Sequence, residues 1–189
     1  QALLTPAATR FVSPLALRTL TGHAVDADLL DLLPDGRIGH IVAADSADAI
    51  LVAPATAQWL GAMAGGLAGD VVTATCLATT APVVVAPAMD GEMWAHPATQ
   101  RKFSVLQRDG IQAVGPMEGE MAESGERGLG RMAEPEQIRD RHRARDAYGP
   151  DRTITVHLTS VMHELDVIRD RHPEYFIREA AAPGGDRRG

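Results

Sequence analysis

The chain has 189 residues, 45% of them hydrophobic, which suits one α/β domain with a buried core. A formal net charge of -7 argues against nucleic acid or an anionic membrane as the main partner. No apolar run approaches the roughly 18 residues of a membrane-spanning helix, so no membrane association is expected. The first residues lack the basic start and apolar run of a signal peptide. Cys76 is the single cysteine, which excludes an internal disulfide and fits a reducing, cytoplasmic compartment.

The first quarter of the chain predicts one strand end and two helices. Residues 2–5 are typical of the end of a strand. Ser13 followed by proline is a good helix start, and we expect that helix to stop at Gly22. Residues 25–30 give at best a weak strand, and residues 42–47 predict a short helix.

Two clear strands follow. Residues 49–53 are apolar and predict the first, which leads into a helix that ends at Gly65 and Gly66. Asp70 is expected to cap the next helix. Residues 82–86 are all apolar, are rich in β-branched side chains and are bounded by prolines. This pattern predicts a strand that is buried on both faces.

Strand and helix patterns therefore alternate, which is typical of a parallel sheet with helices on both faces. The elements expected further on are, in chain order, a helix at 97–108, a strand at 111–114, a mobile flap at 118–130, a charged helix at 136–145, a strand at 153–158, a helix at 160–171 and a disordered tail at 180–189.

Three loops should leave the sheet at one edge, because the carboxyl ends of parallel strands meet there. They are residues 5–11, 54–59 and 87–94. Open α/β sheets bind ligands at this edge, and Thr56 and Gln58 stand at or near a helix N-terminus that favours a phosphate. The loops suit a planar phosphorylated cofactor. The methionines and tryptophan of residues 87–94 could equally complete the core.

Single residues are weaker evidence. His40 stands at a helix start, but one of seven histidines is more often structural or solvent-exposed than catalytic. Cys76 lies among alanine and leucine and is expected to be a buried apolar residue. No histidine, cysteine and carboxylate set has the spacing of a metal site. Neither a dinucleotide fingerprint nor a P-loop is present.

Several segments match one family together and in family order. They are residues 5–12, 39–41, 49–57, 65–70, 87–90 with 93–94 and 97–100, and 128–135. With them the chain resembles the flavin-containing cysteine decarboxylases, most closely the flavoprotein domain of the phosphopantothenoylcysteine decarboxylases of coenzyme A biosynthesis. The resemblance covers residues 3–138, about seven-tenths of the chain.

The resemblance implies a Rossmann-like, flavodoxin-type parallel sheet that binds FMN at the carboxyl ends of its strands. It also implies a homotrimer or dodecamer, because FMN sits between subunits in this family. The implied activity is FMN-dependent decarboxylation of 4'-phosphopantothenoylcysteine, or a related cysteine-containing substrate, through a thioaldehyde and an enethiol.

The resemblance also assigns site residues. His40 matches the active-site histidine, with a role in proton handling. Residues 118–130 match a lid that closes over the substrate. The implied FMN contacts are Thr5, Ala7, Phe11, Thr56, Ala57, Gln58 and Ala88, and the implied substrate contacts are Asp90, Met93 and Ser124.

Two departures from the family matter. Relatives have asparagine where this chain has Asp90, and an ionised carboxylate donates no hydrogen bond and repels a substrate carboxylate. Either Asp90 is protonated, or the substrate differs, or activity is lost. Glu123 and Ser124 stand where many relatives carry a reducing cysteine, so the reaction could stop at the enethiol. Cys76 is in the wrong segment to replace that cysteine.

The domain prediction follows from the same comparison. Relatives begin with a strand and a glycine-containing turn, and this sequence enters after them. Either the sequence is a fragment, or the sheet lacks its central strand, which would expose the edges of the neighbouring strands. Residues 1–138 are expected to form the flavoprotein domain, and residues 139–189 an unassigned extension.

Two other functions remain open. Asp90, Glu123 and the absent first strand favour a catalytically degenerate flavin-binding or regulatory subunit. A flavin prenyltransferase shares the fold, but those enzymes lack the motif at residues 87–90 and Trp94, so this alternative is weaker.

Overall fold

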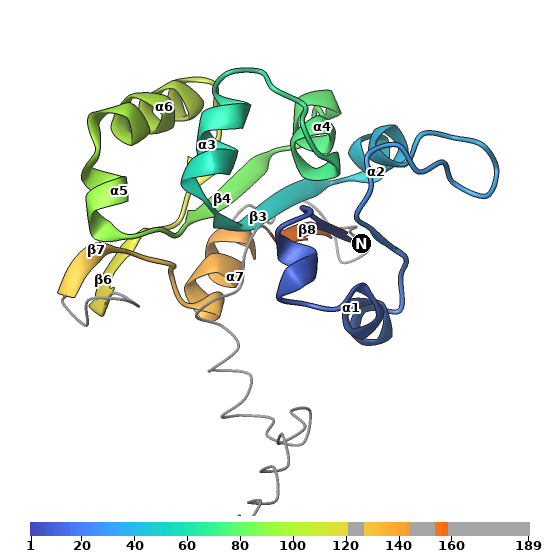
Figure 1. Cartoon of the computed structure of the whole chain (residues 1–189), viewed down its shortest axis with the longest axis horizontal. Helices are drawn as coiled ribbons and strands as arrows, with labels where there is room; N and C mark the ends of the chain where they lie inside the picture. Colours follow the sequence, from blue (N-terminus) through green and yellow to red (C-terminus); the bar gives the residue numbers. More distant parts are fainter. Residues whose placement is uncertain (121–126, 144–153, 159–189) are drawn as a thin grey trace, which may run out of the picture.

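A computed structural model describes residues 1–120, 127–143 and 154–158 (Figure 1). Six of the described strands form one sheet in the order β2-β1-β8-β3-β4-β5, and every neighbouring pair is parallel. These strands are β1 (Ala2–Leu4), β2 (Val25–Asp26), β3 (Ala49–Ala55), β4 (Val83–Pro87), β5 (Gln112–Ala113) and β8 (Ile154–Leu158). The predicted α/β fold with a parallel sheet is confirmed.

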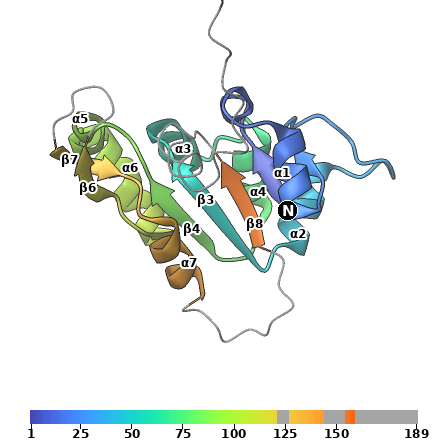
Figure 2. The ribbon, with the colours of Figure 1, turned by 90° about the horizontal axis from the view of Figure 1, so that it is seen from below.

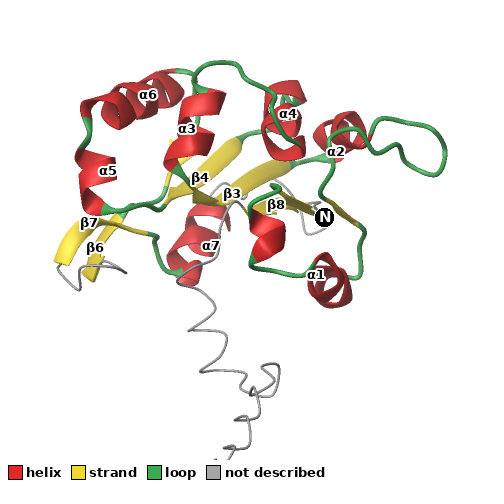
Figure 3. Ribbon diagram, in the orientation of Figure 1, coloured by secondary structure: helices red, strands yellow, loops and turns green. Residues whose placement is uncertain are grey.

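Helices cover both faces of this sheet (Figures 2 and 3). One face carries α2 (Gly39–Ser46), α3 (Ala57–Met63), α4 (Val71–Ala78) and α6 (Pro97–Arg108). The other carries α1 (Pro14–Thr21), which follows the 3-10 turn η1 (Ala8–Arg10), and α7 (Pro135–Arg143). The short helix α5 (Gly91–Ala95) lies beside an antiparallel hairpin of β6 (Met117–Glu120) and β7 (Arg127–Arg131).

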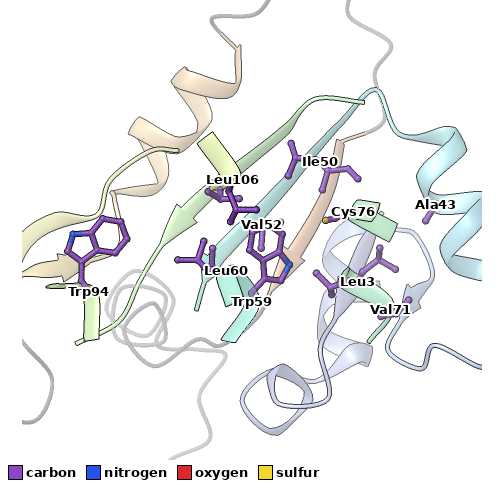
Figure 4. Packing of buried hydrophobic residues seen from close by; sticks show 14 residues of the cluster. Leu3, Ala43, Ile50, Val52, Trp59, Leu60, Val71, Cys76, Trp94 and Leu106 are labelled. Carbon is purple, nitrogen blue, oxygen red and sulfur yellow. The ribbon is translucent and has the colours of Figure 1, made fainter. Parts of the chain in front are cut away.

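The main core lies between the sheet and the helices α2, α3, α4 and α6 (Figure 4). Leu3 of β1 and Ile50 and Val52 of β3 are fully buried there. All five residues of β4 are buried, as its apolar sequence predicts. The chain is poor in aromatic residues, and Trp59 and Trp94 are the buried aromatic residues of this core, with Phe103 packed against it.

Local capping signals form as the sequence predicts. The Ser13 hydroxyl accepts a hydrogen bond from the Leu15 N–H at 3.2 Å, and Gly22 ends the helix with a φ of 70°. The Asp70 carboxylate accepts the N–H groups of Val72 and Thr73, both at 2.9 Å, in a capping box that starts α4.

Three expected elements differ. Helix α2 begins at Gly39, three residues before the prediction, so His40 lies in its first turn. The predicted loop at 87–94 contains the five-residue helix α5. The predicted flap at 118–130 includes strands β6 and β7, whose register places Glu118 opposite Leu129. The helix predicted at 160–171 and the tail at 180–189 lie outside the described residues.

The largest difference lies at the centre of the sheet. The predicted strand at 153–158 forms β8, which pairs with β1 on one side and with β3 on the other. The facing edges of β1 and β3 are therefore both paired, and the expected exposed edges do not occur there. Residues 154–158 thus belong to the sheet formed by residues 1–138, and the domain boundary after residue 138 stays a prediction. In the described part of the chain, no helix is long and apolar enough to cross a bilayer.

Candidate functional site

The parallel pairing of β1, β8, β3 and β4 brings three loops to one edge of the sheet. Thr5 follows β1, Thr56 follows β3 and Ala88 follows β4. The Ala88 N–H donates to the Ala55 carbonyl at 3.1 Å, so the second and third loops begin side by side. This confirms that the three loops share one edge of the sheet, as predicted. Open α/β sheets bind their ligands at this edge.

The loop after β1 is held by its own hydroxyl groups. The buried Thr5 side chain accepts the Ala8 N–H at 3.2 Å, and the Thr9 hydroxyl donates to the Pro6 carbonyl at 2.8 Å. These bonds start η1. Ala7 and Phe11 are left exposed, so both remain available to a ligand or to another copy of the chain.

The loop after β3 becomes the N-terminus of α3. The Thr56 side chain accepts the Trp59 N–H at 3.3 Å and caps the helix. The N–H groups of Ala57 and Gln58 are in the first turn, where they have no partner within the helix. Gln58 is exposed, whereas Trp59 turns into the core. Backbone donors beside small side chains suit a phosphate or a flat ring.

The turn after β4 combines core packing with exposed polar groups. Met89 packs against the main core, and Trp94 is buried edge-on against Phe103 with ring centroids 4.9 Å apart. Asp90 is exposed, and its carboxylate accepts the Glu92 N–H at 2.9 Å to cap α5. Met93 is 51% exposed. Part of this apolar sequence therefore completes the core, while Asp90 and Met93 face outward.

The hairpin of β6 and β7 is held against this turn. The Met89 N–H donates to the Gly130 carbonyl at 3.0 Å. A Cβ atom at Gly130 would collide with the Met89 carbonyl oxygen, and one at Gly91 would touch the backbone of Leu129. Sequence reasoning did not single out Gly130, although glycines on both sides of Leu129 are a signal of close backbone approach.

His40 is half-buried in the first turn of α2, and its Nδ1 atom is buried without a hydrogen-bond partner. A buried polar atom without a partner is uncommon and marks a place where a ligand or water would be expected. Figures 1 and 2 place α2 and α5 at opposite ends of the sheet, so one chain does not bring His40 beside Asp90. Ser124 lies outside the described residues.

No metal site emerges among residues 1–120, 127–143 and 154–158, where no three histidine, cysteine or carboxylate side chains are close enough to share an ion. The ion pair nearest to the hairpin joins Arg131 and Glu134 at 2.7 Å, and both side chains are partly exposed. An ion pair this exposed contributes little to the free energy of unfolding.

A family model described as "Flavoprotein" matches residues 1–145 of the chain. The bifunctional coenzyme A biosynthesis protein CoaBC of Haemophilus influenzae is 45% identical over 136 residues. That match covers 72% of this chain and 34% of the relative, so the chain spans about a third of that protein's length.

Two solved structures are also similar. The FMN-dependent cysteine decarboxylase SpaF aligns with a TM-score of 0.58 and 37% identity, over 68% of this chain and 70% of that one. A mutant of PPC decarboxylase in complex with pantothenoylaminoethenethiol aligns with a TM-score of 0.61 and 28% identity. That alignment covers 76% of this chain and 96% of the other.

Cys76 should be chemically inert in the folded protein. Burial raises the pKa of its thiol far above the ordinary value, and the nearby Asp70 carboxylate raises it further. Because the thiolate is the reactive form, iodoacetamide at pH 8 should label Cys76 only after unfolding in guanidinium. Mass spectrometry measures the labelled fraction. Labelling of the native protein at the rate of a free thiol would contradict this.

The variant Gly130→Ala should move the hairpin off the turn after β4, since its Cβ would meet rigid backbone. We expect a loss of about 1–3 kcal/mol in unfolding free energy, as for other overpacked sites. Hydrogen exchange of the Met89 amide should become faster. Gly69→Ala is the matched control, because a Cβ there meets nothing within 4 Å. Equal exchange at Met89 in both variants would refute the contact.

Proposed function

The chain belongs to the Flavoprotein family, and from this we propose that it binds FMN at the carboxyl edge of its sheet and decarboxylates a cysteine-containing substrate. The proposed substrate is 4'-phosphopantothenoylcysteine or a related compound, in line with the activity named for SpaF and for PPC decarboxylase. The observation that carries the proposal is the juxtaposition of the ends of β3 and β4 at the N-terminus of α3. A cytoplasmic location is proposed with it.

The residues at this edge fit FMN. Ala55, Ala57 and Ala88 are small, so a flat ring can approach their backbone closely. Thr56 and the first N–H groups of α3 suit the phosphate, and Thr5, Ala7, Phe11 and Gln58 would contribute from the adjoining loops. When bound, FMN supplies a two-electron oxidation of the substrate cysteine, which makes loss of carbon dioxide favourable.

His40 would handle the proton of the substrate thiol or carboxylate. Its Nδ1 atom has no protein partner, so this nitrogen is free to accept or donate a hydrogen bond to a ligand. An imidazole can both accept and donate a proton, which suits a general acid or base.

A complete site would need a second copy of the chain. Helices α2 and α5 lie at opposite ends of one sheet, so His40 would meet Asp90 and Met93 of a neighbouring subunit. The proposed assembly is a homotrimer or dodecamer.

The alternative is a catalytically degenerate flavin-binding or regulatory subunit. One observation favours it: the exposed Asp90 carboxylate would repel a substrate carboxylate. A flavin prenyltransferase is less well supported, because the motif at residues 87–90 and Trp94 are typical of the decarboxylases.

The first test measures carbon dioxide release from 4'-phosphopantothenoylcysteine by the FMN-loaded protein. His40→Ala should lower this rate by about 10²- to 10⁴-fold, the usual contribution of a general acid or base. FMN absorbance and the oligomer mass from light scattering should not change. His23→Ala is the control, since His23 is exposed at the end of α1. A wild-type protein that binds FMN without releasing carbon dioxide would favour the regulatory alternative.

The second test replaces Asp90 by asparagine. Asparagine caps a helix as well as aspartate does, so α5 should persist while the negative charge is removed. If a substrate carboxylate binds here, losing about 1 kcal/mol of repulsion should raise kcat/KM about fivefold. Asp109→Asn, at the end of α6, controls for the change in net charge. An unchanged or lower kcat/KM would show that no carboxylate binds at Asp90.

A further inference from the structure

We propose that Arg10 binds a phosphate monoester at the carboxyl edge of the sheet and so selects phosphorylated ligands there. The inference rests on the proposed function and deepens it, because FMN and 4'-phosphopantothenoylcysteine both carry such a phosphate. The contacts expected in the loop after β1 are Thr5, Ala7 and Phe11, none of which is charged. Arg10 would add the positive charge that this loop needs to hold a phosphate.

The charges at this edge of the sheet are unevenly distributed. The loops after β1, β3 and β4 contain one basic side chain, that of Arg10, and two acidic ones, those of Asp90 and Glu92. Both carboxylates are exposed, and the hairpin beside α5 adds the exposed side chains of Glu118 and Glu120. A phosphate monoester carries about 1.5 to 2 negative charges at pH 7, so the end of the edge at α5 repels it. The loop after β1 is the favourable end for a phosphate.

Arg10 lies on the outer side of a turn whose backbone is fixed. In η1 the Arg10 N–H donates to the Ala7 carbonyl at 3.1 Å, and the Phe11 N–H donates to the Ala8 carbonyl at 3.0 Å. Side chains three residues apart lie on the same side of a 3-10 turn, so Arg10 shares a side with Ala7, which is exposed. Ala8, on another side, is fully buried. The guanidinium is therefore on the side that a ligand can reach.

Within the described part of the chain, no ion pair involves Arg10. The ion pairs found there are Arg37–Asp35, Arg131–Glu134 and Arg139–Asp140. Arg127 of the hairpin lies opposite Glu120, whose charge offsets that of its guanidinium. An arginine binds a phosphate through two parallel N–H···O bonds, and no protein carboxylate competes for those donors at Arg10.

The first arm of the test compares FMN with riboflavin, which lacks the phosphate. Quenching of flavin fluorescence measures the binding of each compound to the full chain, in the wild type and in Arg10→Gln. If the phosphate of FMN is the partner, Arg10→Gln should weaken FMN binding by ~10- to 100-fold, as expected for the loss of a hydrogen bond to a charged group. Riboflavin binding should not change. Arg10→Lys keeps the charge without the paired donors and should recover part of the loss.

The second arm tests the phosphate of the substrate without relying on turnover. Titration calorimetry on the FMN-loaded protein compares 4'-phosphopantetheine, which is the proposed substrate without its carboxylate, with pantetheine. If this phosphate is the partner, Arg10→Gln should raise the Kd of 4'-phosphopantetheine by ~10- to 100-fold and leave that of pantetheine unchanged. The two arms therefore distinguish the cofactor from the substrate as the source of the phosphate.

Arg18→Gln is the matched control, because Arg18 is an exposed arginine of α1 outside the three loops. It makes the same change in charge and should alter neither comparison. Equal affinities of Arg10→Gln and Arg18→Gln in both arms would overturn the inference and leave the proposed function standing. An equal loss with phosphorylated and unphosphorylated ligands would also overturn it. If the wild type binds none of the four compounds, the proposed function fails, and the inference fails with it.

Discussion

The parallel alignment of β1, β8, β3 and β4 is the constraint on which the other features depend. Because all four strands point the same way, the residues that follow them meet at one edge. The bond from Ala88 to Ala55 then fixes two of the loops relative to each other. This alignment gives Thr5, Thr56 and Ala88 a common position although they are far apart in the sequence. No single motif in the chain would define a ligand site without it.

In the turn after β4, the backbone geometry and the side-chain charge are determined by different interactions. Its backbone is fixed by the Met89 N–H bond to Gly130, by close packing at Gly91 and by the side-chain cap at the start of α5. Aspartate and asparagine cap a helix equally well. The departure from the family at Asp90 therefore changes the charge at this position and leaves the capping interaction of the turn in place. Removal of the charge at Asp90 therefore tests the electrostatic effect of this residue without changing the shape of the turn.

Elements with local signals could be predicted from the sequence. Ser13, Gly22 and Asp70 mark helix ends through bonds to neighbouring residues, and the apolar run of β4 reports burial on both faces. The sequence also predicts the strand of residues 154–158 but not its position in the sheet, because no local pattern encodes pairing with strands more than a hundred residues away. The glycine-rich hairpin has low strand propensity and forms only against the turn after β4. The position of His40 relative to Asp90 depends on how whole helices are arranged.

The candidate site therefore depends on two long-range associations that differ in physical character. In the proposed assembly, His40 would meet the Asp90 carboxylate of a second copy of the chain, so this contact would weaken on dilution by mass action. The spacing of the Thr5 and Thr56 loops requires β8, which comes from the same chain and is independent of concentration. Loss of the first would leave the proposed ligand loops at the ends of β3 and β4 without the imidazole. The second association is present in each copy of the chain, whatever the assembly, because β8 pairs with β1 and β3 of the same chain.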